Sequence, residues 1–145
     1  MLLIHGILLL LYVLTKKNNI GYTDVPMFSA RFFLVNKKML NLLLEYAKDE
    51  FEILETNCLD GDYVIVNVID KIDCIDMDNS IYKVWKGDKN EIRSYDKLYL
   101  KKDELCGKHL FRAKHTTNAF FVCSDILKIE IENRGIIGLK FEFID

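Results

Sequence analysis

The sequence predicts a single α+β domain, mostly antiparallel sheet with two or three packed helices. A chain of 145 residues has the length of one domain. Runs with the two-residue period of strands outnumber segments with the 3.6-residue period of helices. One Pro and seven Gly leave no room for a long linker or a low-complexity segment.

A β-hairpin is predicted over residues 51–69. Residues 51–59 and 63–69 are apolar runs, and Asp60-Gly61-Asp62 between them favours a tight turn, because Gly accepts positive φ. The second run is apolar nearly throughout, as is typical of a central strand.

Two helices flank the predicted strands. Residues 37–46 repeat apolar positions at helical spacing. A second helix begins after the N-cap Ser124, continues to Asn133 and closes at Gly135 in the left-handed conformation. Further strands are expected over residues 31–36, 80–85, 91–100, 110–113, 119–123 and 138–144, with a turn over 87–90 and a loop over 114–118.

Residues 2–14 form an apolar run interrupted by His5. The run is shorter than the roughly twenty residues that a spanning helix needs. No cation precedes it, and Lys16 and Lys17 follow it, the reverse of a secretory signal. A buried element is favoured; a membrane or export segment and a start-site artefact stay open. The expected division is an apolar segment over 1–20 and a folded domain over 21–145.

Composition excludes several classes of function. A net charge of −2 disfavours nucleic-acid binding, since such proteins are usually basic. Cys58, Cys74, Cys106 and Cys123 are irregularly spaced, which fits neither a zinc motif nor a disulfide framework. Buried free thiols in a reducing cytoplasm are expected.

Four carboxylates follow the central strand within nine residues: Asp70, Asp73, Asp76 and Asp78. A calcium loop starting at Asp76 would need Gly at its sixth position and Glu at its twelfth, where this chain has Ile81 and Gly87. No metal site is therefore predicted.

The acidic run then has two interpretations. It presents negative potential to a basic partner, which would speed association. Alternatively, Asp73 and Asp76 cap a turn or pair with Arg112 inside the fold, and the other carboxylates are solvated. Trp85 stands beside a turn and is either an interface anchor or a residue of a satellite core, the second being slightly favoured. The hypothetical partner contacts are Asp70, Asp78, Trp85, Asp88 and Tyr95.

No catalytic residue and no cofactor is predicted. Cys106, His109 and His115 are close in sequence but lack an identifiable third member of a triad or a fourth zinc ligand. Phosphate-loop, dinucleotide, serine-elbow and metalloprotease motifs are absent from the sequence.

Several motifs in order resemble a known family. They are Tyr63-Val-Ile-Val-Asn-Val, Ile72-Asp-Cys-Ile-Asp76 with Ser80, His109-Leu-Phe-Arg112, Phe121-Val-Cys-Ser124 and Gly135-Ile-Ile-Gly-Leu-Lys-Phe141. Over about residues 21–145 the chain resembles the immunity-protein family numbered eleven of bacterial polymorphic toxin systems, first described as a domain of unknown function. Residues of these motifs are given structural roles: Asp73, Asp76, Ser80, Arg112, Ser124, Gly135 and Gly138.

The resemblance implies a non-enzymatic antitoxin in the cytoplasm of the producing bacterium. It would bind the effector domain of a cognate secreted toxin and neutralise it by stoichiometric occlusion. Two alternatives stay open: a small enzyme that reverses toxin damage, and a membrane-associated binding protein that uses residues 2–14.

Overall fold

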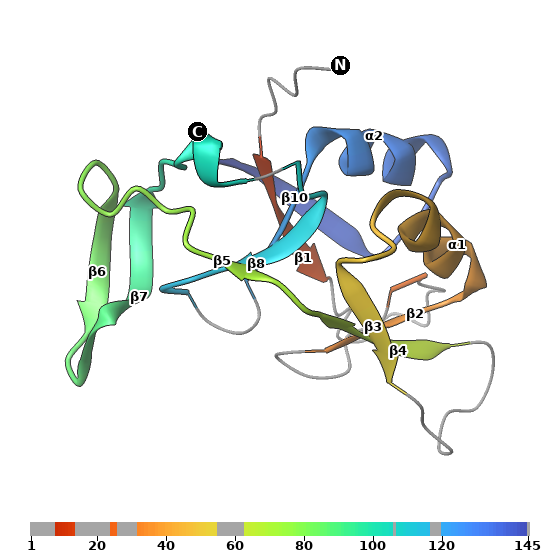
Figure 1. The fold of residues 1–145 in the computed structure, drawn as a ribbon, viewed down its shortest axis with the longest axis horizontal. Helices are drawn as coiled ribbons and strands as arrows, with labels where there is room; N and C mark the ends of the chain where they lie inside the picture. Colours follow the sequence, from red (N-terminus) through yellow and green to blue (C-terminus); the bar gives the residue numbers. More distant parts are fainter. Residues whose placement is uncertain are drawn as a thin grey trace.

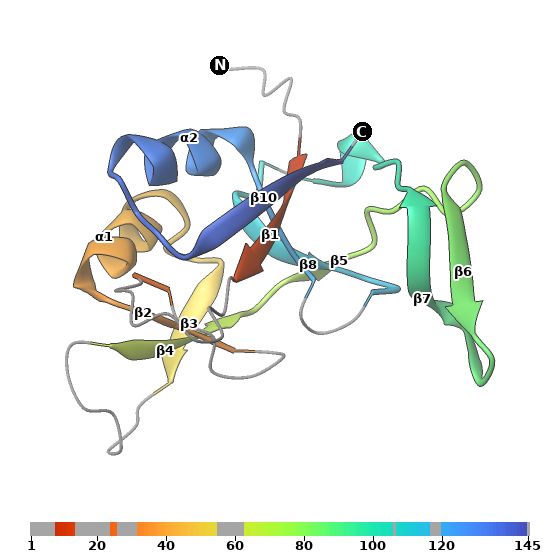
Figure 2. The same cartoon turned by 180° about the vertical axis from the view of Figure 1, so that it is seen from behind.

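A computed structural model describes residues 8–13, 24–25, 32–54, 63–105, 107–116 and 120–144, with only the backbone described for 8–13. Helices α1 (Lys37–Tyr46) and α2 (Asp125–Asn133) lie together at one end of the molecule, and a hairpin of two strands lies at the other (Figures 1 and 2). The α+β class, with more strand than helix, is confirmed.

The largest sheet has five strands, in the order β10-β1-β9-β8-β5. They are β10 (Leu139–Ile144), β1 (Leu8–Val13), β9 (Phe121–Cys123), β8 (Leu110–Ala113) and β5 (Lys71–Ile72). All neighbours are antiparallel except β5 and β8, which are parallel. The sequence left the status of the N-terminal apolar run open; its residues 8–13 form a strand between β9 and β10.

The predicted hairpin is confirmed where it is described. β3 (Phe51–Leu54) and β4 (Val64–Val68) are antiparallel, and β4 is the central strand of a sheet completed by β2 (Phe33–Val35). Residues 55–62, including the expected Asp60-Gly61-Asp62 turn, lie outside the described residues.

Strands β8 and β9 separate two hydrophobic cores, because successive side chains of a strand point to opposite faces. Leu110, Phe121 and Cys123 pack into the core beneath the helices, whereas Phe111 and Val122 pack into a second core. The Phe33 and Phe121 rings, 5.2 Å apart and nearly perpendicular, join the two larger sheets.

Both helices begin and end as their sequences indicate. Asn36 and Ser124 are the N-caps, accepting hydrogen bonds from Met39 N (3.0 Å) and Leu127 N (3.2 Å). Beyond α2, Gly135 has φ +63°, the left-handed conformation that favours glycine. Within the described residues, no helix is long and apolar enough to span a bilayer.

The third sheet is a separate hairpin of β6 (Ile81–Trp85) and β7 (Asp88–Lys97). The turn predicted over 87–90 is wrong, because Trp85 pairs with Asp88 and leaves Lys86 and Gly87 as the loop. The strand expected from residue 119 begins at Phe121; residues 117–119 lie outside the described part.

Candidate functional site: the acidic segment and the β6–β7 hairpin

Two consecutive stretches contain the partner contacts predicted from the sequence. We call residues 70–78 the acidic segment and residues 81–97 the β6–β7 hairpin. The segment runs from β5 in the five-stranded sheet, in the middle of the molecule, to the hairpin, which lies at the end away from the helices (Figure 1).

Asp70 is held by the body of the protein. Its carboxylate lies 2.6 Å from the Lys108 ammonium, and the two side chains are about one-third exposed. Its carbonyl accepts a hydrogen bond from the Arg112 amide at 2.8 Å. Asp70 therefore anchors the start of β5 against β8.

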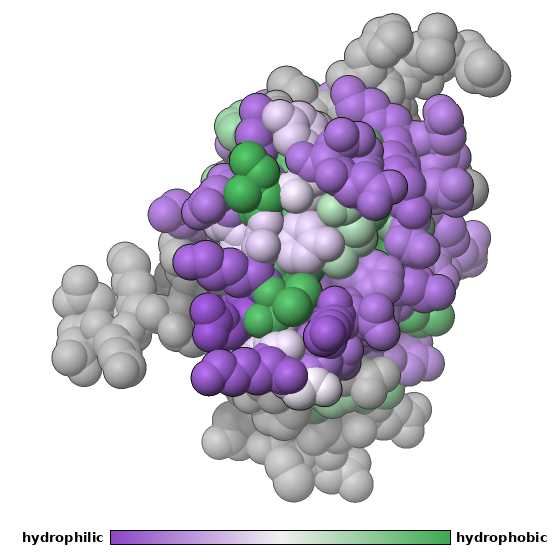
Figure 3. All heavy atoms as spheres, turned by 90° about the vertical axis from the view of Figure 1, so that its left-hand side faces the viewer, coloured by the Kyte–Doolittle hydropathy of each residue, from purple (hydrophilic) through white to green (hydrophobic). Residues whose placement is uncertain are grey.

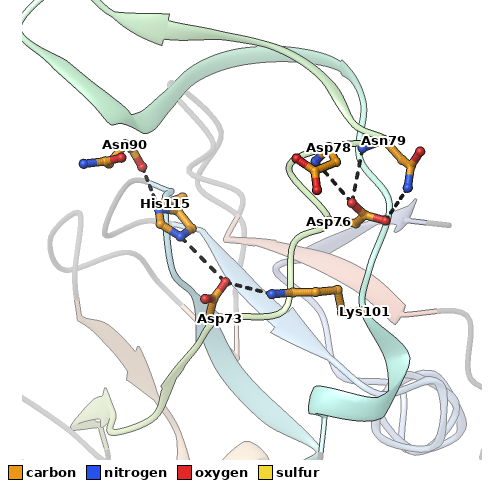
Figure 4. Close-up of polar contacts among 7 residues, drawn as sticks. All are labelled: Asp73, Asp76, Asp78, Asn79, Asn90, Lys101 and His115. Carbon is orange, nitrogen blue, oxygen red and sulfur yellow. Dashed lines mark hydrogen bonds and ion pairs between the residues drawn. The ribbon is translucent and has the colours of Figure 1, made fainter.

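Asp73 forms an ion pair with Lys101. One carboxylate oxygen lies 3.3 Å from Lys101 Nζ and 3.6 Å from His115 Nε2 (Figure 4). The alternative that Asp73 pairs with Arg112 stays a prediction; Arg112 is buried in β8, where the β5–β8 register places Lys71 opposite it.

Asp76 caps the turn that leads into the hairpin. This is the turn-capping role that one of the two interpretations of the acidic run gave to it. Its carboxylate accepts from the Asp78 amide (3.2 Å) and from the Asn79 amide (3.2 Å) and side chain (2.7 Å) (Figure 4). The Asn79 side-chain hydrogen bond, with these amide bonds, lowers the pKa of Asp76 below its usual 3.8. Ser80 also has a structural role, since its hydroxyl accepts from the Tyr99 amide at 2.9 Å.

Asp78 differs from these three carboxylates. It is exposed, and its side chain makes no hydrogen bond or ion pair within the part of the chain that the structure describes. Of the four carboxylates of the acidic segment, Asp78 is therefore the one whose side chain has no partner among the described residues.

The β6–β7 hairpin has two unlike faces, and Ile81, Lys83 and Trp85 define what we call its outer face. In β6 these residues are exposed, whereas Tyr82 and Val84 are half-buried. Ile81 is 56% and Trp85 46% exposed, which is high for such large apolar side chains. Figure 3 shows this end of the molecule, where hydrophobic residues are interspersed among hydrophilic ones.

The five hypothetical contacts do not form one surface. Trp85 and the exposed Asp88 are cross-strand neighbours at the hairpin loop. Tyr95 instead pairs with Tyr82 on the inner face, and its ring meets the Phe120 ring edge-on at 6.1 Å. Asp70 lies at the far end of the acidic segment.

Reasoning from sequence missed the positive charge of the hairpin. Residues 81–97 contain five cationic and three acidic side chains. The cations are Lys83, Lys86, Lys89, Arg93 and Lys97, and the carboxylates are Asp88, Glu91 and Asp96. The excess of positive charge was visible in the sequence, because all five cations recur at intervals of three or four residues.

Two of the four cysteines, Cys74 and Cys123, lie within the described residues, and both are buried. Among the described residues no three metal-binding side chains cluster. Burial raises the pKa of Cys74 to about 12 and that of Cys123 still further, so both are protonated thiols at neutral pH. Cys106 lies outside the described residues.

Two clefts lie on the described surface. One of about 270 Å³ is lined by residues of β7, Thr116 and Phe120. A more polar one of about 380 Å³ includes Glu50, whose carboxylate accepts from the amides of His109 (3.0 Å) and Leu110 (2.6 Å) and so is not a free base. Nδ1 of the half-buried His109 lies 2.7 Å from the buried N-cap hydroxyl of Ser124.

The fold is that of a small α+β protein with an exposed two-stranded hairpin at one end. The chain matches the immunity protein family Imm11 over residues 14–145, which is nearly its whole length, and it belongs to that family. The match confirms the resemblance and supports a role as an immunity protein. A comparison with curated proteins gives no match.

Proposed function

We propose that the chain is an antitoxin that binds the effector domain of a cognate secreted toxin and neutralises it by stoichiometric occlusion in the cytoplasm. Membership of the immunity protein family carries this proposal. The exposed Trp85 supports it, because a large aromatic side chain near the centre of an interface often supplies much of the binding energy.

The proposed interface uses Asp78, Trp85 and Asp88; Asp70 and Tyr95 lie apart from these three, since Asp70 pairs with Lys108 and Tyr95 packs on the inner face of the hairpin. The first three side chains are exposed. A stable complex would bury about 1,200–2,000 Å² in total, more than the hairpin alone offers, so neighbouring elements would contribute.

The test titrates the toxin domain encoded beside this chain with the purified protein. Occlusion predicts that toxin activity falls linearly and ends at one equivalent, and that a complex of fixed ratio elutes from a sizing column. Protection by far less than one equivalent would instead show an enzyme that reverses toxin damage. Absence of both protection and complex would refute the immunity role.

Charge reversal tests the acidic contacts separately. The pair Asp70→Lys and Asp78→Lys should weaken toxin binding and change its salt dependence if the acidic segment faces a basic cleft. Unchanged affinity and salt dependence would exclude that contact while leaving the immunity role intact.

A further inference from the structure

The hairpin is held rigidly, so its outer face is organised before any partner arrives. Its inner face packs through Tyr82, Ile92 and Tyr95 into the second core. The amide of Ile92 donates to the carbonyl of His115 at 2.7 Å, and His115 Nδ1 donates to the Asn90 carbonyl at 2.7 Å. A rigid surface loses little conformational entropy on binding.

The outer face combines apolar and cationic side chains. Ile81, Lys83 and Trp85 alternate with half-buried residues along β6, so all three project the same way. Lys86 follows Trp85 in the exposed loop, and Ile81 pairs with Lys97 across the hairpin. The two large apolar residues therefore have lysines as neighbours in the chain or across the hairpin, and the Lys97 ammonium itself lies over the Tyr99 ring, 4.8 Å from its centroid.

The charge of the hairpin is opposite to that of the whole chain. Cations outnumber carboxylates by five to three over residues 81–97, whereas the full chain carries a net charge of −2. Complementary potentials steer partners together and disfavour wrong ones. The partner chemistry that fits is an acidic protein surface with an apolar depression.

Nucleic acid fits the same surface less well. Asp88, Glu91 and Asp96 are interspersed with the cations and would repel a phosphate backbone. An exposed isoleucine contributes binding free energy when an apolar protein pocket buries it, whereas a phosphate backbone offers no apolar surface to bury it.

We infer that the outer face of the β6–β7 hairpin binds an acidic surface of the toxin, with Trp85 and Ile81 packed against apolar residues between toxin carboxylates. This inference rests on the proposed function and names the chemistry of its partner. It assigns the attractive charge to the hairpin rather than to the acidic segment.

The test measures association and dissociation rates of the wild-type chain and two variants with the purified toxin domain, at low and high salt. Trp85→Ala should weaken binding by about 30-fold or more, mainly through faster dissociation, as for a central aromatic anchor. The double variant Lys83→Glu with Lys86→Glu should slow association by about 10-fold at low salt, and high salt should shrink the difference.

Matched controls separate local effects from general ones. Ile129→Ala removes a similarly exposed apolar side chain from α2, 50% exposed. The pair Lys48→Glu with Lys140→Glu makes the same charge change at exposed lysines outside the hairpin. Both controls should bind like wild type, and circular dichroism should show all variants folded.

The outcomes distinguish the two proposals. Wild-type chain that neither binds nor protects overturns the proposed function and the inference with it. Wild-type chain that binds while the hairpin variants bind equally well, or the double variant binds more tightly, overturns the inference alone. Binding to a duplex oligonucleotide that Lys83→Glu with Lys86→Glu abolishes, with toxin affinity unchanged, would assign the face to nucleic acid and equally overturn it.

Discussion

The acidic segment and the β6–β7 hairpin adjoin in the chain but use their charges differently. In the acidic segment, Asp70 pairs with a lysine and Asp73 with a lysine and a histidine. Asp76 accepts hydrogen bonds from the turn that follows it. On the hairpin, Lys83, Lys86 and Trp85 are exposed. A dense run of like charges in a sequence therefore need not become a charged surface.

The reason for the difference is geometric. The acidic segment runs along the body, where Lys101, Lys108 and His115 come within reach from later parts of the chain. The hairpin stands at the end of the molecule and is covered on one face only (Figure 1). Four changes, from the largest expected effect to the smallest, test this comparison.

The largest effect should come from the inner face of the hairpin. Ile92, 4% exposed, lies in the second core, and Ile92→Ala should lower the free energy of unfolding by about 2–4 kcal/mol through lost burial and a cavity. Ile81→Ala on the outer face, where the side chain is 56% exposed, should change it by less than about 0.5 kcal/mol. Urea denaturation measures both, and equal losses would refute the assignment of the two faces.

The next effect concerns His115, which joins the two regions through Asp73 and the Asn90 carbonyl. Its φ of +67° is rare for a non-glycine residue. His115→Ala loses both contacts and keeps the strained backbone, so we expect a cost of about 1–2 kcal/mol.

The matched variant His115→Gly loses the same contacts but relieves the backbone. It should unfold at a higher urea concentration than His115→Ala, by about 0.5–1 kcal/mol in free energy. If the alanine variant is the more stable of the two, the left-handed conformation is not a constraint at this position.

A smaller effect should separate Asp70 from Asp78. A double-mutant cycle of Asp70→Asn and Lys108→Met should give a coupling of about 0.5–1 kcal/mol, modest because the pair is partly exposed to solvent. Asp78→Asn should leave stability unchanged. A measurable loss there would show that Asp78 also has an internal partner, and the contrast between engaged and presented carboxylates would fail.

The smallest effect is the loss of the stabilising contribution of Asp76 at low pH. Its pKa is lowered in the folded state, so its stabilising contribution is present above the unfolded value near 3.8 and is lost as pH falls through the folded pKa. NMR titration should find the Asp76 pKa below 3.8, and Asn79→Ala should raise it by removing the principal hydrogen bond. An Asp76 pKa insensitive to Asn79→Ala would refute this cause.

Local patterns predicted most of the fold. The β3–β4 pair and α1 follow from periodicity, and the start and end of α2 follow from Ser124 and Gly135. The parallel β5–β8 pair could not be predicted, because it joins segments far apart in the chain. Pairing partners across such distances depend on the packing of the whole domain.

The candidate site was less predictable for the same reason. Asp70 and Asp78 look alike in sequence, and only the distant Lys108 distinguishes them. The sequence grouped Tyr95 with Trp85 as partner contacts. The register shifts between β6 and β7 interrupt the regular alternation of side chains between the two faces of the hairpin, so the face on which Tyr95 lies could not be derived by counting residues from the loop. The position of Trp85 beside a turn left open whether it was a core residue or an interface anchor, and only the structure shows that it is 46% exposed.

The position of β1 sets the order in which the protein can be completed. β1 is synthesised before every other described element and β10 after all of them, yet β1 pairs along its length with β10, from Leu8 opposite Ile144 to Val13 opposite Leu139. Pairing across so long a loop is slow, because the entropy of closure must be lost before the contact is gained. A ribosome-bound chain that lacks β10 therefore cannot finish its largest sheet. Any activity that needs the complete five-stranded sheet therefore waits for the synthesis of β10.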